Sequence, residues 1–182
     1  MKDYSNQKAE IATIKERNIT ISLSDEDCRR LSIKAGSVGF TVDELLRNFI
    51  GDLVDGTYSN GSDERMYANQ WLERCGFSYF SESTLLSYLL NTFNYGIDAV
   101  KRLIDYYDEV NELKVSIAQA KEYSEDCKNN IQSLEDDLEG CLINYHSYVD
   151  EFLDEHPDAD IKKEIDICRK WLNEYAQITQ AG

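Results

Sequence analysis

Residues 18–54 read NITISLSDEDCRRLSIKAGSVGFTVDELLRNFIGDLV, and this stretch decides the fold that we expect. Apolar and polar residues alternate over its first six positions, a pattern typical of a short β-strand with one apolar face. The apolar face consists of Ile19, Ile21 and Leu23, and the polar face consists of Asn18, Thr20 and Ser22. The stretch therefore begins with a predicted strand.

Two short helices are predicted after this strand. Ser24 and Thr41 are their N-cap residues, and each is followed three positions later by an acidic residue, Asp27 or Glu44, as in a capping box. A glycine-containing turn at 36–39 separates the two helices. The second helix has an apolar face made of Val42, Leu45, Leu46, Phe49, Ile50, Leu53 and Val54.

A single strand cannot complete a sheet, because both of its edges stay unpaired. We therefore expect a homodimer in which the strands of two copies pair and pack on the helices. The predicted dimer core consists of Ile19, Ile21, Leu23, Leu45 and Phe49. The stretch resembles the ribbon-helix-helix superfamily, the Arc/MetJ type of repressor. That resemblance implies a DNA-binding regulator whose outward strand residues read bases and whose second helix holds a phosphate at its start. The residues concerned would be Asn18, Thr20, Ser22, Thr41 and Val42.

The charge of the chain argues against autonomous DNA binding. The 182 residues include 19 Lys and Arg against 35 Asp and Glu, a formal net charge of −16. Residues 18–54 contain four basic and six acidic residues, and Asp43 and Glu44 stand beside the predicted phosphate site. Release of counterions from DNA would then add little affinity. A DNA-binding regulator therefore stays as the alternative function, with duplex DNA as the alternative partner.

The rest of the chain predicts further helices around this module. We expect a flexible arm at 1–17, a small helical layer at 57–96 and a final helix at 158–180. Over 97–155 the apolar residues keep one 3-4 spacing, which predicts a long coiled-coil helix that pairs with a second copy or folds back on a neighbour. The fold class is thus mainly α, with a ribbon-helix-helix dimer core.

The predicted coiled coil is strongly acidic, with 18 acidic and 5 basic residues over 97–160. A rod of this charge could occupy a basic groove that normally holds nucleic acid, although a solvated dimerisation stalk explains the same charges. The candidate partner-binding residues are Glu135, Asp136, Asp137, Glu139, Asp150 and Glu151.

No enzyme motif is present, so we expect a protein that is not an enzyme and needs neither a cofactor nor a metal. His146 and Asp150 are one helical turn apart, a pairing that is common by chance. The five cysteines have no metal-binding spacing, which favours reduced core thiols. No signal peptide or membrane-spanning stretch is recognisable, which predicts a cytoplasmic protein without membrane contacts.

The whole chain, including GTYSNGSDERMYANQWLERCGF at 56–77, resembles anti-CRISPR proteins of mobile genetic elements that act on type II RNA-guided nucleases. This resemblance implies a non-enzymatic inhibitor that binds the nuclease directly. Such nucleases hold nucleic acid in a positively charged channel, which an acidic protein could block or lock in one conformation.

Overall fold

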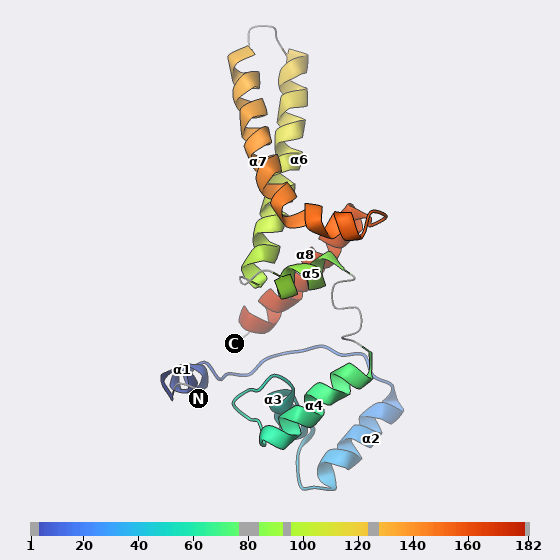
Figure 1. Cartoon of the computed structure of the whole chain (residues 1–182). Helices are drawn as coiled ribbons and strands as arrows, with labels where there is room; N and C mark the ends of the chain where they lie inside the picture. Colours follow the sequence, from blue (N-terminus) through green and yellow to red (C-terminus); the bar gives the residue numbers. More distant parts are fainter. Residues whose placement is uncertain (1–3, 77–83, 93–95, 124–127, 181–182) are drawn as a thin grey trace. The chain divides into compact units, whose positions relative to one another are not determined.

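The computed structural model describes residues 4–76, 84–92, 96–123 and 128–180. Among these residues there are eight α-helices and no β-strand, so the predicted mainly-α class is confirmed (Figure 1). The chain divides into two compact units. The N-terminal unit comprises residues 1–80 with 178–182, and the C-terminal unit comprises residues 81–177.

The N-terminal unit contains α1 (Tyr4–Ala12), α2 (Asp25–Gly36), α3 (Val42–Leu53) and α4 (Ser62–Arg74). Both predicted caps are present. The Asp27 N–H donates to Ser24 Oγ at 3.1 Å, and the Glu44 N–H donates to Thr41 Oγ1 at 3.2 Å. Helix α3 packs on both α2 and α4. Local capping thus places the two helices where the sequence predicts them.

The predicted strand is wrong, and with it the ribbon-helix-helix module. Residues 14–24 have no regular secondary structure, and the alternating residues Ile19, Ile21 and Leu23 are exposed to solvent. A strand requires a hydrogen-bonding neighbour as well as alternating side chains, and no strand in the described part of the chain supplies one. The predicted 1–17 arm also differs, because it contains α1.

The C-terminal unit contains α5 (Leu85–Thr92), α6 (Ile97–Tyr123), α7 (Lys128–Glu155) and most of α8 (Ile161–Gln180). The last three residues of α8, 178–180, belong to the N-terminal unit. Its core brings together residues from all four helices. The fully buried members of this core are Leu85, Leu89, Val100, Leu103, Val149, Phe152, Ile165 and Cys168.

The predicted single helix over 97–155 is two helices. Helix α6 ends at Tyr123, α7 begins at Lys128, and the two lie side by side as an antiparallel hairpin (Figure 1). Ring contacts between Tyr106 and Tyr148, at 6.0 Å, and between Tyr107 and Tyr145, at 6.1 Å, set their register. A 3-4 apolar spacing serves an intramolecular helix pair as well as an intermolecular one, so the spacing alone did not identify the partner.

The predicted helical layer at 57–96 is divided between the units, since α4 belongs to the N-terminal unit and α5 to the C-terminal unit. The prediction of five core thiols is wrong for two of them, because Cys28 and Cys75 are exposed. Cys127 lies outside the described residues. Cys141 and Cys168 are buried, and burial raises the pKa of these thiols to about 11 and about 12.

Candidate partner-binding surface

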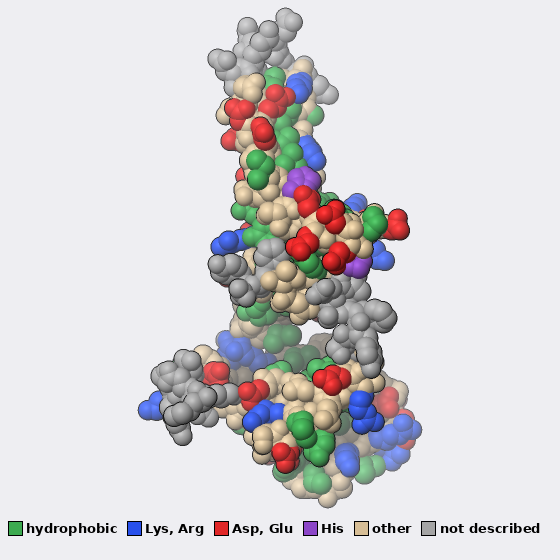
Figure 2. Space-filling view, viewed as in Figure 1, with side chains coloured by type: hydrophobic (Ala, Val, Ile, Leu, Met, Phe, Trp, Pro, Cys, Tyr) green, Lys and Arg blue, Asp and Glu red, His purple; other side chains and the backbone are tan. Residues whose placement is uncertain are grey.

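The two units differ strongly in charge. Residues 81–182 contain 9 basic and 22 acidic residues, a net charge of −13, whereas residues 1–80 contain 10 basic and 13 acidic residues, a net charge of −3. Figure 2 shows acidic side chains gathered over the hairpin and especially over α7. The acidic character of the protein is therefore concentrated in the C-terminal unit.

Helix α7 has one apolar side and one acidic side. Cys141, Val149 and Phe152 are buried against the rest of the C-terminal unit. The acidic side chains of α7 stand on the other positions, because the 3.6-residue period of the helix turns them away from this buried side. The exposed acidic residues are Asp136, Asp137, Glu139, Asp150, Glu151, Asp154 and Glu155.

Several of the predicted partner-binding carboxylates have local hydrogen-bond partners. Lys121 Nζ lies 2.8 Å from Glu135 Oε1 and partly neutralises that side chain. The Tyr88 hydroxyl donates to Glu151 Oε2 at 2.7 Å and ties α5 to α7. Gln132 Nε2 donates to Asp136 Oδ1 at 2.8 Å. These contacts fix the carboxylate positions on the helix surface without burying them.

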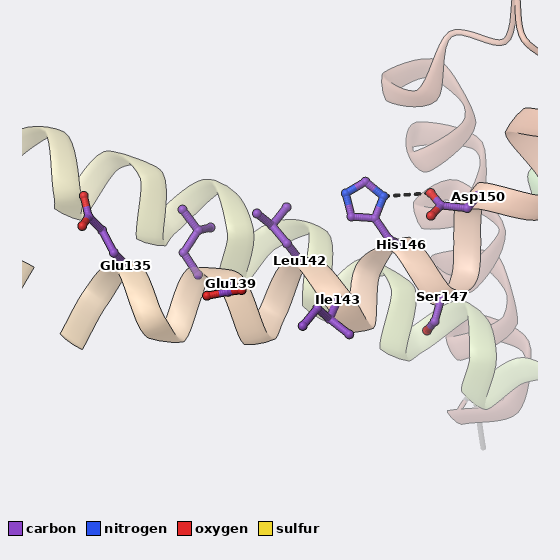
Figure 3. Close-up of a pocket in the computed structure, with 8 residues that line it drawn as sticks. Glu135, Glu139, Leu142, Ile143, His146, Ser147 and Asp150 are labelled. Atoms are coloured by element: carbon purple, nitrogen blue, oxygen red, sulfur yellow. Dashed lines mark hydrogen bonds and ion pairs between the residues drawn. The ribbon is translucent and has the colours of Figure 1, made fainter. Parts of the chain in front are cut away.

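A shallow groove of about 490 Å³ runs along this acidic side of α7 (Figure 3). Leu138, Leu142 and Ile143 supply its apolar part, and Ile143 is 65% exposed. Glu135, Glu139, His146, Ser147 and Asp150 supply its polar part. This apolar strip was not predicted from the sequence, although Ile143 stands outside the 3-4 seam of α7 and could have indicated it. An apolar strip between carboxylates is suited to contact with a protein.

The groove does not resemble a catalytic site. His146 Nδ1 and Asp150 Oδ1 are 2.8 Å apart, but both side chains are more than half exposed and belong to the same helix (Figure 3). All eight lining residues come from α7, so polar groups from separate elements do not converge here as they do in most ligand pockets. Among the described residues, no group of three or more His, Cys, Asp and Glu side chains is arranged to hold a metal ion.

The residues predicted to bind DNA are not brought together as a reading surface. Asn18, Thr20 and Ser22 lie in the irregular segment 14–24. At the start of α3, the Thr41 N–H donates to Glu44 Oε2 at 2.8 Å, and this hydrogen bond lowers the pKa of the Glu44 carboxyl. A phosphate at Thr41 and Val42 would therefore meet a carboxylate that already occupies the helix N-terminus.

The structure shows a charged contact that was not predicted from the sequence. Asp52, in the last turn of α3, is buried, and its carboxylate accepts hydrogen bonds from the Asn60 N–H at 2.6 Å and from Asn60 Nδ2 at 2.8 Å. These bonds lower the pKa of Asp52. They fix the loop between α3 and α4, which is a structural role. The Asn60-Gly61 turn was the available sequence signal.

Comparison of the chain with known protein families, characterised proteins and solved structures finds no match. In the described part of the chain, no helix has both the length and the apolar character required to cross a lipid bilayer.

Proposed function

We propose that this protein is a non-enzymatic inhibitor that binds a type II RNA-guided CRISPR nuclease and presents the acidic side of α7 to the basic nucleic-acid channel of that nuclease. The class of nuclease comes from the sequence-based expectation of an anti-CRISPR protein. The observation that carries the proposal is the concentration of exposed carboxylates on the α6–α7 hairpin.

The four carboxylates at 135–139 of α7 are spaced about as densely as phosphates in a duplex. Glu135, Asp136, Asp137 and Glu139 fall within five residues, or about 7.5 Å of helix axis, which is about one charge per 2 Å. Duplex DNA has one charge per about 1.7 Å of axis. A channel that neutralises phosphates with Lys and Arg can therefore pair with this segment at a similar charge density.

The groove adds an apolar contact to this electrostatic one. Ile143 and Leu142 lie between the two acidic clusters of α7, at 135–139 and 150–155. Exposed ion pairs supply mainly association rate and specificity, whereas buried apolar area supplies more of the affinity. Binding should therefore weaken with salt but persist at physiological salt.

The test is a binding titration of the full-length protein against a purified type II nuclease, with and without guide RNA, together with a DNA-cleavage assay. We expect binding and inhibition. The triple variant Asp136→Asn, Asp137→Asn, Glu139→Gln should bind about 10-fold more weakly, since exposed charge pairs contribute about 0.2–1 kcal/mol each.

The matched control changes three exposed carboxylates of α4 by the same total charge, in the variant Asp63→Asn, Glu64→Gln, Glu73→Gln. This control should bind like the wild type. No binding to the nuclease in either form, or an equal loss in both triple variants, would overturn the proposal. A parallel titration with duplex DNA tests the alternative function. A DNA-binding regulator would bind DNA sequence-specifically in the absence of the nuclease.

A further inference from the structure

The most amphipathic helix of the N-terminal unit, α3, has an apolar face that the chain does not bury. This face, which we call the α3 stripe, consists of Val42, Leu45, Leu46, Phe49, Ile50, Leu53 and Val54. None of these seven residues is buried. Phe49, near the centre of the stripe, is 45% exposed, and Val54 is 65% exposed. The stripe continues onto α4, because the ring of Trp71 lies 6.1 Å from that of Phe49.

The N-terminal unit has almost no core to compensate for this exposure. Among its described residues, the buried hydrophobic ones are Ala35 and Ala68. Both side chains are small, so their burial stabilises the unit little. In the C-terminal unit, by contrast, the apolar residues Leu103, Val149 and Phe152 are fully buried. The apolar residues that would make a comparable core in the N-terminal unit lie on its surface.

We infer that the α3 stripe is the interface at which two copies of this chain associate. The inference is independent of the proposed function, which concerns the other unit. The dimer expected from the sequence pairs two strands, whereas this interface joins helical surfaces. A unit that lacks a core needs a partner to cover its apolar surface whenever it is folded. A second copy of the chain is such a partner, because it is present wherever the protein is made. Obligate interfaces of this kind resemble a domain core cut in half.

The exposed apolar area agrees with that of a stable dimer. A large apolar side chain has about 150–250 Å² of surface, so the four half-exposed residues Phe49, Ile50, Val54 and Trp71 leave roughly 350 Å² uncovered. The four partly covered residues of the stripe add roughly 150 Å². Homodimer interfaces are about 65% apolar, so roughly 500 Å² of apolar area corresponds to about 770 Å² per protomer, close to the roughly 800 Å² of a standard interface.

Charge also favours self-association through this unit. Residues 1–80 have a net charge of −3, so two such surfaces repel each other weakly. Beside the stripe, Asp43 and Arg47 form an i,i+4 pair with 4.0 Å between their charged atoms, which leaves the rim close to neutral. Two copies of the hairpin, each in a unit of net charge −13, would repel each other far more strongly.

The test measures the mass of the full-length protein by sedimentation equilibrium over a wide concentration range. We expect about 42 kDa, twice the chain mass of 21.0 kDa, together with unfolding of the N-terminal unit that shifts to higher temperature as protein concentration rises. Ile50→Asp and Val54→Asp should each shift the mass toward that of the monomer. Ile143→Asp, a matched change on α7 at an apolar position that is as exposed as Val54, should leave the dimer intact.

A wild-type protein that is monomeric at every concentration and keeps its helical circular dichroism would overturn the inference, because another occupant would then cover the stripe. A dimer that survives both stripe variants would overturn it as well. The wild-type measurement decides even if a variant fails to fold.

Discussion

Gly51 lies where α3 meets the loop that leads to α4, and replacing it by alanine should destabilise the N-terminal unit. A Cβ at this position would lie 2.6 Å from the backbone carbon of Tyr58 and 2.8 Å from both the Tyr58 oxygen and the Ser59 nitrogen. These are backbone atoms, so the loop itself would have to move. Three contacts oppose that movement: Asp52 with Asn60, Arg65 with Asp55 at 3.0 Å, and Arg47 over the Tyr58 ring at 4.7 Å.

The expected magnitude follows from two opposing effects. Alanine within a helix is favoured over glycine by about 0.5–1 kcal/mol. Overpacking of a close contact costs about 1–3 kcal/mol. We therefore expect Gly51→Ala to lower the free energy of unfolding of the N-terminal unit by about 1–2 kcal/mol. The control is Gly140→Ala in α7, where a Cβ would meet nothing within 4 Å. It should stabilise the C-terminal unit by about 0.5–1 kcal/mol.

Each unit contains one of the two tryptophans, so fluorescence can follow the units separately. Trp71 belongs to α4 in the N-terminal unit, and Trp171 belongs to α8 in the C-terminal unit. Urea unfolding would be measured at one fixed protein concentration in Trp171→Phe and Trp71→Phe backgrounds. If Gly51→Ala left the Trp71 transition unchanged or moved it to higher urea, the close approach of Gly51 to Tyr58 would be refuted.

Three further predictions concern single side chains. Phe152→Ala removes a ring that is 1% exposed and whose centre lies 4.7 Å from that of the His156 ring. It should lower the free energy of unfolding of the C-terminal unit, measured by Trp171 fluorescence, by about 3–5 kcal/mol. The unfolding transition measured by Trp71 should not change. Hydrogen bonds from Asn60 lower the pKa of Asp52 in the folded protein. The Asp52 carboxylate therefore stabilises the fold at pH values above its unfolded pKa of about 3.9. This stabilisation is lost as the pH falls through the folded pKa. The acid-induced change in Trp71 fluorescence should therefore be smaller in Asp52→Asn, and an identical pH dependence would contradict this assignment. Iodoacetamide at pH 8, followed by peptide mass spectrometry, should modify the exposed thiols long before the buried ones, and equal rates would contradict the burial. The exposed thiols are Cys28 and Cys75, and the buried ones are Cys141 and Cys168.

The sequence predicts those features of the fold that depend on neighbours along the chain. The caps at Ser24 and Thr41 are confirmed because each uses a backbone N–H three residues away. The strand at 18–23 is wrong because strand formation depends on a distant partner, which three alternating apolar residues do not specify. The hairpin of α6 and α7 was left open for a similar reason, since a 3-4 spacing shows that a helix has a partner without showing which one.

The sequence predicts the charge of the candidate partner-binding surface on α7 but not its shape. The clusters at 135–139 and 150–155 are visible in the sequence, and the structure exposes most of their carboxylates. The groove beside Ile143 depends on which sides of α7 face α5 and α6, and that follows only from the tertiary packing. The Asp52–Asn60 contact likewise depends on a loop conformation, because the two residues are eight positions apart in the chain.

The two units differ in core and in charge, and this difference supports nuclease binding by the C-terminal unit and dimerisation by the N-terminal unit on separate physical grounds. Leu103, Val149 and Phe152 provide the C-terminal unit with a core, so it can fold while its net charge of −13 keeps its surface available to a basic partner. The same charge disfavours association between two hairpins. In the N-terminal unit, a net charge of −3 and the uncovered α3 stripe favour self-association instead. Because the two surfaces use different residues on different units, a dimer formed through α3 would present two acidic hairpins, and two linked binding surfaces raise the apparent affinity for a clustered target without any new contact.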